Sequence, residues 1–131
     1  MIFNEERAEL SGTLGKTPVV LEASFGRVNR YEKTAGMNFV QCANHFMQGD
    51  AVTVSEAALF LSAFVKQEPE LTYEQAGDLI MKNGMTQVIP FFTPVISKVL
   101  GGRFETEEQM KARLEEEAKL GNAQAETSPS N

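Results

Sequence analysis

The sequence predicts a mainly α-helical protein with a short N-terminal β-hairpin, in which five to six helices form a small bundle. Three observations lead to this fold class. Apolar residues alternate with glycine and threonine near the start of the chain. From Ser24 onward, apolar residues recur at spacings of three and four. Three later segments open with a capping box, in which a threonine is followed three residues on by Glu or Gln.

The hairpin is expected over about residues 8–23. Gly15 and Lys16 can form its tight turn, with glycine at the first central position. Pro18 must then lie at an edge or at the start of a strand, because proline cannot donate to a ladder. The apolar residues of the two strands are Leu10, Leu14, Val19, Val20 and Leu21.

Two amphipathic helices should follow the hairpin. The first begins after Ser24 as N-cap and stops at Gly36. Its expected core face consists of Phe25, Val28, Tyr31 and Ala35. The second helix ends at Gly49-Asp50, and its apolar residues are Phe39, Ala43, Phe46 and Met47.

Two capping boxes open the next two helices. Thr53 and Glu56 begin a helix over about 54–66 that is apolar nearly all round, which is typical of a central or covered helix. Thr72 and Gln75 begin a helix that runs to about 83–84. The apolar segment 85–100 comes next, where Pro90 and Pro94 predict a break near 89–90 or a kink at 94.

The chain therefore divides into a hairpin plus helical domain over 1–102, an acidic helix over 103–120 and a tail over 121–131. Thr106 and Gln109 cap the acidic helix, which carries three glutamates near its C-terminus, the unfavourable end for anions. Two interpretations stay open: this helix forms fully on a partner, or it is solvated and frays. The tail contains only alanine as apolar residue, so we expect it to be disordered.

Composition excludes several classes of function. The chain has 131 residues and a net charge of −6, which argues against a general nucleic-acid binder because phosphate recognition needs a basic stripe. The single Cys42 cannot form an internal disulfide, which suits a reducing cytoplasm. The N-terminus does not resemble a signal peptide, and no apolar run is long enough to predict a membrane span.

Candidate chemical motifs are incomplete. Gly15, Lys16 and Thr17 match the last three residues of a phosphate-binding loop. Leu10 stands where that loop needs its first glycine, and no helix is expected to follow. Cys42 and His45 lie three apart on one helix, yet the chain has no other Cys or His to complete a zinc site. A Cys-His nucleophile would also need an orienting group and oxyanion donors. We therefore expect neither cofactor nor metal nor enzymatic activity, with Cys42 in the core.

Nine phenylalanines and six methionines are the most informative feature of the composition. Most of them should be core residues of the bundle. The rest are expected to form an exposed patch, which usually marks a protein interface, and methionine suits surfaces that accept varied partners.

The order of features resembles a known family. VVLEASFGRVNRYEKTAG (19–36), FVQCANHFMQGDAVTVSEAALFLSAFV (39–65) and LTYEQAGDLIMKNGMTQVIPFFTPVISKVLGG (71–102) together are similar to the phage tail assembly chaperones, small tail proteins of siphophages and gene transfer agents. The resemblance covers about residues 9–102. It rests on three sets of positions: Phe25, Gly26, Glu32 and Gly36; Phe46 and Gly49; and Tyr73, Ala76, Leu79, Ile80 and Gly84.

The resemblance implies a non-enzymatic protein of the bacterial host cytoplasm that binds the tape-measure protein, with the major tail-tube protein as a second partner. An acidic helical protein with an adaptable Phe/Met groove could shield the apolar stripes of such a client. The candidate groove residues are Phe60, Phe64, Met81, Phe91 and Phe92, each of which also has an interpretation as core.

Two alternatives stay open. A tail-tube or virion subunit should be rich in strands, and only about 15 residues here read as strand. A small helical adaptor or regulator unrelated to phages also fits the composition, although no basic recognition helix supports a transcription factor.

Overall fold

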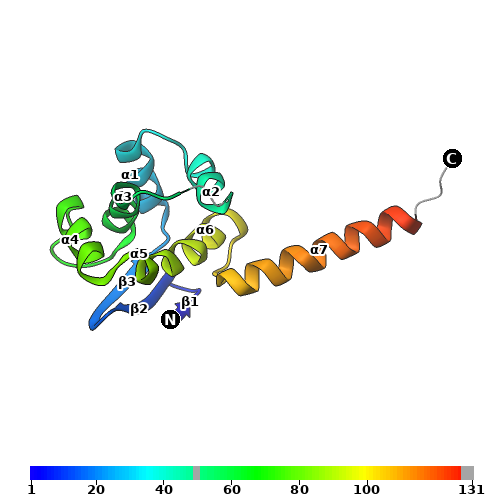
Figure 1. Cartoon of the computed structure of the whole chain (residues 1–131), viewed down its shortest axis with the longest axis horizontal. Helices are drawn as coiled ribbons and strands as arrows, with labels where there is room; N and C mark the ends of the chain where they lie inside the picture. Colours follow the sequence, from blue (N-terminus) through cyan, green and yellow to red (C-terminus); the bar gives the residue numbers. More distant parts are fainter. Residues whose placement is uncertain (49–50, 128–131) are drawn as a thin grey trace.

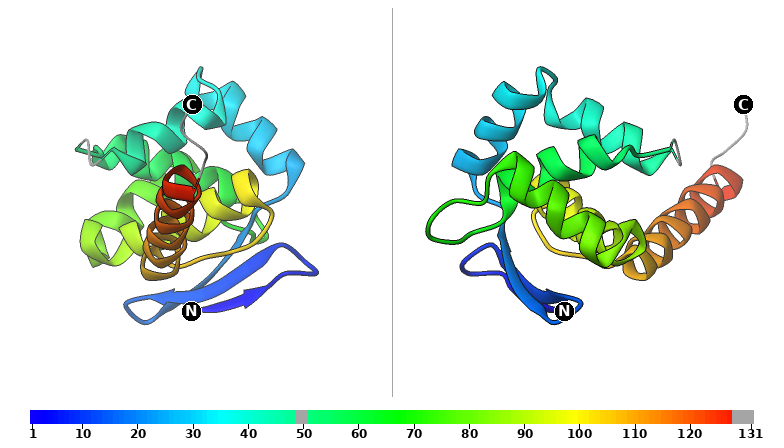
Figure 2. Two further views of the ribbon diagram at one scale, coloured as in Figure 1. Left: turned by 90° about the vertical axis from the view of Figure 1, so that its right-hand side faces the viewer. Right: turned by 60° about the vertical axis from the view of Figure 1, so that its left-hand side comes forward.

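The computed structural model describes residues 1–48 and 51–127, with side chains described up to Gly121. It confirms a mainly α-helical fold with a small N-terminal antiparallel sheet. The sheet lies along one side of the helical body, and the last helix projects away from that body (Figures 1 and 2).

The predicted hairpin is confirmed. Strands β2 (Glu9–Leu14) and β3 (Thr17–Glu22) pair antiparallel, with Leu10 opposite Leu21. Gly15 turns the chain with a φ of 62°, in the left-handed region that glycine adopts without strain. An unexpected strand, β1 (Ile2–Asn4), pairs with the outer edge of β2. The side chains that point from β2 and β3 into the core are Leu10, Leu14, Val19 and Leu21.

The next two helices are α1 (Phe25–Ala35) and α2 (Phe39–Met47). Ser24 caps α1 as expected, and Gly36 ends it with a φ of 69°. The assignment of Phe25 to the core face is wrong, because its side chain is 85% exposed. Phe25 is the first helical residue, and α1 meets the core only further along, where Tyr31 is buried.

The predicted capping boxes open α3 (Val54–Phe64) and α4 (Tyr73–Asn83). α3 ends two residues earlier than expected. Val65 leaves the helix to form a bridge with Leu21, and the Lys66 N–H donates to the Val20 carbonyl at 2.7 Å. The end of α3 is therefore tied to the edge of the sheet.

The prolines divide the following segment where expected, into α5 (Met85–Val88), the short 3₁₀ helix η1 (Ile89–Phe91) and α6 (Phe92–Gly101). Pro90 lies within η1, so the break predicted near 89–90 is confirmed. Pro94 is the third residue of α6, in the first turn, where backbone N–H groups have no partner in the helix.

The last helix, α7 (Glu107–Thr127), begins at the predicted Thr106 cap but is longer than expected. The helix continues through residues 121–127, which the sequence had assigned to the tail. Residues 128–131 of the predicted tail lie outside the described residues.

The core is centred on α3, which packs against both α1 and α4. Phe60, Leu61 and Phe64 of α3 have no exposed surface. The sheet closes another side of the core, where the ring of Phe91 lies so close to Gly12 that a β-carbon there would be 2.8 Å from it. A side chain at residue 12 would displace this ring.

Candidate functional site

Four of the five candidate groove residues lie in the core. Phe60, Phe64, Phe91 and Phe92 are almost completely buried, and the rings of Phe60 and Phe92 are 4.7 Å apart. Their assignment to a surface groove is therefore corrected, because a central helix covered on several sides buries every large side chain. Met81 is 74% exposed on α4, away from these rings in the core.

Two of the positions that carry the family resemblance, Glu32 and Phe46, connect helices. Glu32 of α1 accepts a hydrogen bond from the Phe39 N–H at 2.9 Å and so holds the start of α2. Phe46 of α2 packs on Phe92 of α6, with ring centroids 5.0 Å apart. Gly26 is exposed, with no atom within 4 Å of a β-carbon built there. Gly49 lies outside the described residues.

Cys42 and His45 occupy different environments. The Tyr31 hydroxyl donates to Cys42 Sγ at 3.0 Å inside the core, and burial raises the pKa of this thiol to about 11. A thiol with such a pKa is a poor nucleophile at neutral pH. His45 Nε2 lies 2.7 Å from a carboxylate oxygen of Glu56, at the start of α3. Among residues 1–48 and 51–127, no three His, Cys, Asp or Glu side chains gather as metal ligands would.

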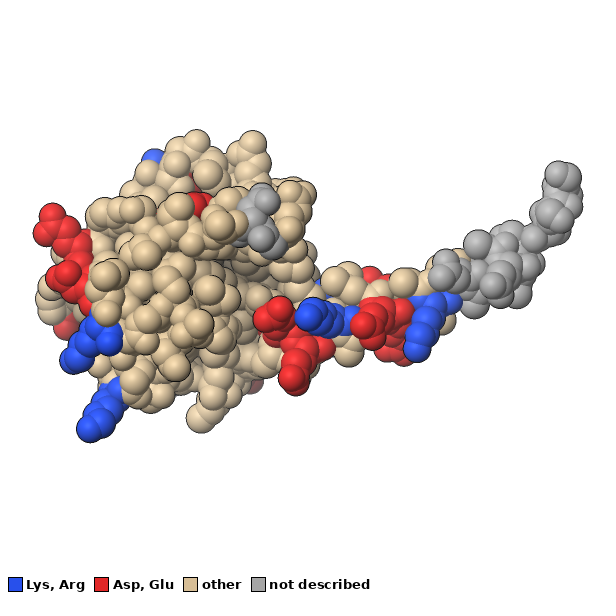
Figure 3. Space-filling model, viewed as in Figure 1, with Lys and Arg blue, Asp and Glu red and all other residues tan. Residues whose placement is uncertain are grey.

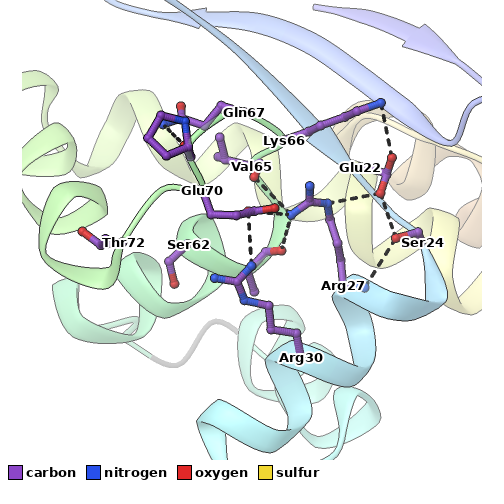
Figure 4. A network of polar contacts seen from close by, with 12 residues as sticks. Glu22, Ser24, Arg27, Arg30, Ser62, Val65, Lys66, Gln67, Glu70 and Thr72 are labelled. Atoms are coloured by element: carbon purple, nitrogen blue, oxygen red, sulfur yellow. Dashed lines mark hydrogen bonds and ion pairs between the residues drawn. The ribbon is translucent and has the colours of Figure 1, made fainter.

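Sequence reasoning missed a polar network around Arg27 (Figure 4). The guanidinium donates to the carbonyls of Ala63 and Val65 at 3.2 Å each, and to carboxylates of Glu22 and Glu70. The last carbonyls of a helix have no N–H donor within the helix, and Arg27 supplies one at the end of α3. The sequence showed only that Arg27 follows Glu22 and the Ser24 cap.

The same network perturbs Glu22. Burial opposes its ionisation, but hydrogen bonds from Ser24 and Arg27 outweigh that effect and hold the pKa of Glu22 below its ordinary value. Lys66 adds a second cation 3.5 Å away. The network joins the sheet, α1 and the end of α3, so it serves the fold.

The surface itself shows a segregation of charge. Segments 34–49 and 83–97 contain no Asp, Glu, Lys or Arg. They form α2 and the run from α5 through most of α6, and the Phe46–Phe92 contact brings them together. We call their described surface the uncharged face. Figure 3 shows a broad area without charged side chains over α5 and α6. The exposed apolar side chains of these segments are Met37, Val40, Met47 and Ile89.

A groove of about 710 Å³ lies at the edge of this face, between α2, α6 and the first half of α7. Its floor is apolar, and its charged residues come from α7 and from the linker before it. We call it the arm groove. Its lining consists of Ala43, Asn44 and Met47; Ile96, Ser97, Leu100 and Gly101; and Arg103, Glu105, Met110, Arg113, Leu114 and Glu117.

A buried carboxylate fixes one wall of the arm groove. Glu105 accepts hydrogen bonds from Ser97 Oγ at 2.7 Å and from Arg113 Nε at 2.9 Å. The bond from Arg113 is the main reason that the pKa of Glu105 lies below its ordinary value. These contacts join α6, the linker and α7, and so set the direction in which α7 leaves the body.

The N-terminal strand holds the same linker from the other side. The ring of Phe3 stacks on that of Phe104, with centroids 5.3 Å apart. The Glu5 carboxylate accepts from the Phe104 N–H at 3.0 Å and from Lys98 Nζ at 2.9 Å. The base of α7 is thus anchored by residues from both ends of the chain.

The chain matches no protein-family model, no curated protein and no solved structure. Within residues 1–48 and 51–127, no helix has the length and apolarity that a membrane span requires. The described surface thus offers two candidate sites, the uncharged face and the arm groove beside the anchored α7.

Proposed function

We propose that this protein is a non-enzymatic tail assembly chaperone, which holds apolar-striped helical segments of a tape-measure protein on its uncharged face until the tail assembles. The observation that carries the proposal is that face, where exposed Met37, Val40 and Ile89 lie in segments free of charged residues. The resemblance of residues 9–102 to the tail assembly chaperones supplies the identity of the client.

The physical reasoning starts from the client. A long helix with an apolar stripe aggregates unless the stripe is covered, and an apolar surface on a folded protein can cover it. Methionine side chains adapt to stripes of varied sequence. The net charge of −6, concentrated away from the uncharged face, would keep the complex soluble. The same face could receive the major tail-tube protein as a second partner in the host cytoplasm.

Co-expression tests this proposal. The full chain is produced together with the long helical protein encoded at its own locus, and the soluble fraction is purified through a tag on the chain. We expect the client to become soluble and to co-purify. Val40→Glu and Ile89→Glu, which place a charge on the uncharged face, should each reduce recovery of the client at least about tenfold.

Met81→Glu is the control, because it charges an even more exposed apolar residue on α4, outside the uncharged face. It should recover as much client as the native chain. A client that is soluble without this protein would contradict the chaperone activity. Stoichiometric presence of the chain in finished particles would instead favour a structural tail subunit.

A further inference from the structure

The arm groove is bounded by one face of each of three helices. Its lining residues on each helix lie three or four positions apart, which places them on one side of that helix. They include Met110, Arg113, Leu114 and Glu117 of α7, Ile96 and Leu100 of α6, and Ala43 and Met47 of α2. Three helix faces turned toward one space accept the side chains of a fourth helix between their own. Helical walls present no strand edge, so an extended segment would gain no backbone pairing there.

The α7 wall of the groove is held in place by the body. Glu105 accepts a hydrogen bond from Arg113 of α7, and Glu5 holds the linker through the Phe104 N–H. Met110 is buried, so the first turn of α7 is packed as well. A preformed site costs its ligand less free energy on binding than a site that must first be ordered.

Apolar side chains of the groove remain in contact with solvent. Met47, Leu100 and Leu114 come from three different helices, and each is about half exposed. Covering such surface is favourable by about 25 cal/mol for each Å² of apolar area. An occupant with apolar side chains would therefore be stabilised by all three walls.

The charged residues of the lining pair with one another. Arg113 contacts Glu105 at 2.9 Å and Glu117 at 3.0 Å, and Arg103 lies 3.8 Å from Glu105. The α2 wall belongs to an uncharged segment. Because each lining charge already has a partner, a further charge brought into the groove would lose hydration without gaining a counter-ion of its own. The groove therefore favours a helix face that is apolar and uncharged.

We propose that the arm groove holds an uncharged, apolar helix face of the tape-measure client, an inference that rests on the proposed function and places one part of the client. The groove is continuous with the uncharged face, because Met47 and Ile96 belong to both. A client helix that lies along that face reaches the groove over uncharged segments. Between Met110 and Glu117, α7 rises about 10 Å, which matches two turns of the client helix.

Binding of a model helix tests the groove by itself. The probe is a fluorescent peptide of about 20 residues, with leucines on one face, glutamines beside them, and Glu–Lys pairs on the opposite face for solubility. Fluorescence anisotropy should show that Leu100→Glu weakens binding at least about tenfold. Leu120→Glu is the matched control, because Leu120 is 58% exposed against 53% for Leu100 but lies on α7 beyond the lining. It should bind the probe as the native chain does.

The same titration tests the chemistry of the occupant. Peptides in which Glu, or Lys, replaces the glutamines beside the leucines should each bind less tightly than the uncharged probe. Leu114→Glu, on the α7 wall, repeats the test from the other side of the groove, and circular dichroism shows which variants are folded. The inference is overturned if the native chain does not bind the probe, if the groove variants bind it as well as Leu120→Glu, or if either charged peptide binds more tightly.

Co-expression with the client separates this inference from the proposed function. We expect Leu100→Glu to recover at least about tenfold less client than Leu120→Glu. If Leu100→Glu recovers as much as the native chain while Ile89→Glu does not, the client uses the uncharged face without the groove, and only the present inference fails. If the native chain recovers no client but binds the probe as predicted, the proposed function fails and the groove remains a site for another apolar helix.

Discussion

The guanidinium of Arg27 joins the sheet, α1 and the end of α3. Its side chain is largely buried. The side chain of Arg30, one turn further along α1, is half exposed and pairs with the equally exposed Glu70 at 3.2 Å. A buried charged donor that satisfies helix-end carbonyls contributes far more to stability than an exposed ion pair. The two arginines thus form a natural comparison.

Arg27→Met should lower the free energy of unfolding by about 2–3 kcal/mol, because it removes the side-chain donor to the Ala63 and Val65 carbonyls and one of the donors to Glu22. Arg30→Met, the control, should change it by less than about 0.5 kcal/mol. Urea denaturation measures both. Equal effects of the two substitutions would show that the buried network does not stabilise the fold.

Glu105 should make stability depend on pH. Its pKa in the folded protein is lowered, chiefly by the hydrogen bond from Arg113, so the folded state binds fewer protons than the unfolded state. The stabilisation is complete above the ordinary value of 4.5 and is lost as the pH falls through the lower folded value. Glu105→Gln should therefore show a smaller loss of unfolding free energy on acidification than the native chain. Urea denaturation at a series of pH values measures this. An equal loss of unfolding free energy in Glu105→Gln and in the native chain would contradict the prediction.

The starts of the helices were the part of the fold that the sequence predicted best, because N-caps are local. The boxes at Thr53, Thr72 and Thr106 all form with the expected partners, and Ser24 and Gly36 bound α1. These signals depend on residues within four positions of one another, so no knowledge of the tertiary structure is needed.

Features that depend on distant residues could not be predicted. β1 forms because β2 offers an edge, and α3 ends early because Val65 meets Leu21. The same limit applies to the site. Periodicity identified apolar helices, but only packing shows that Phe60 and Phe92 fill the core while Met47 and Leu100 stay open. The uncharged segments were visible in the sequence; their contact through Phe46 was not.

Thr53 and Thr106 cap their helices in the same way, but α3 lies in the core and α7 projects from the body, so removing each cap should have a different effect on stability. Thr53→Ala should lower the free energy of unfolding by about 1 kcal/mol, because Thr53 caps the central helix α3. Thr106→Ala removes the same bond from α7, which projects from the body. It should change global stability by less than about 0.5 kcal/mol while increasing amide exchange within α7. Urea denaturation measures the stability of both variants, and hydrogen exchange measures the opening of α7. A larger loss of unfolding free energy in Thr106→Ala than in Thr53→Ala would contradict the central role given to α3.

The whole molecule separates charge from apolar surface. Acidic and basic side chains gather on α7 and at the margins of the body, while α2 and the run from α5 through most of α6 stay free of them (Figure 3). Under the chaperone proposal, this separation would let one surface bind apolar stripes while the charged rest of the molecule keeps the complex in solution. It is the basis of the chaperone proposal.

Oxidative footprinting of the native chain, with and without its client, tests the uncharged face most directly. Met37 and Met81 are both exposed, one in an uncharged segment and one on α4. Mass spectrometry after brief hydroxyl-radical treatment reports the oxidation of each methionine separately. The account predicts that the bound client protects Met37 and leaves Met81 as reactive as before. Protection of Met81 alone, or of neither methionine in a complex shown to be saturated, would contradict it.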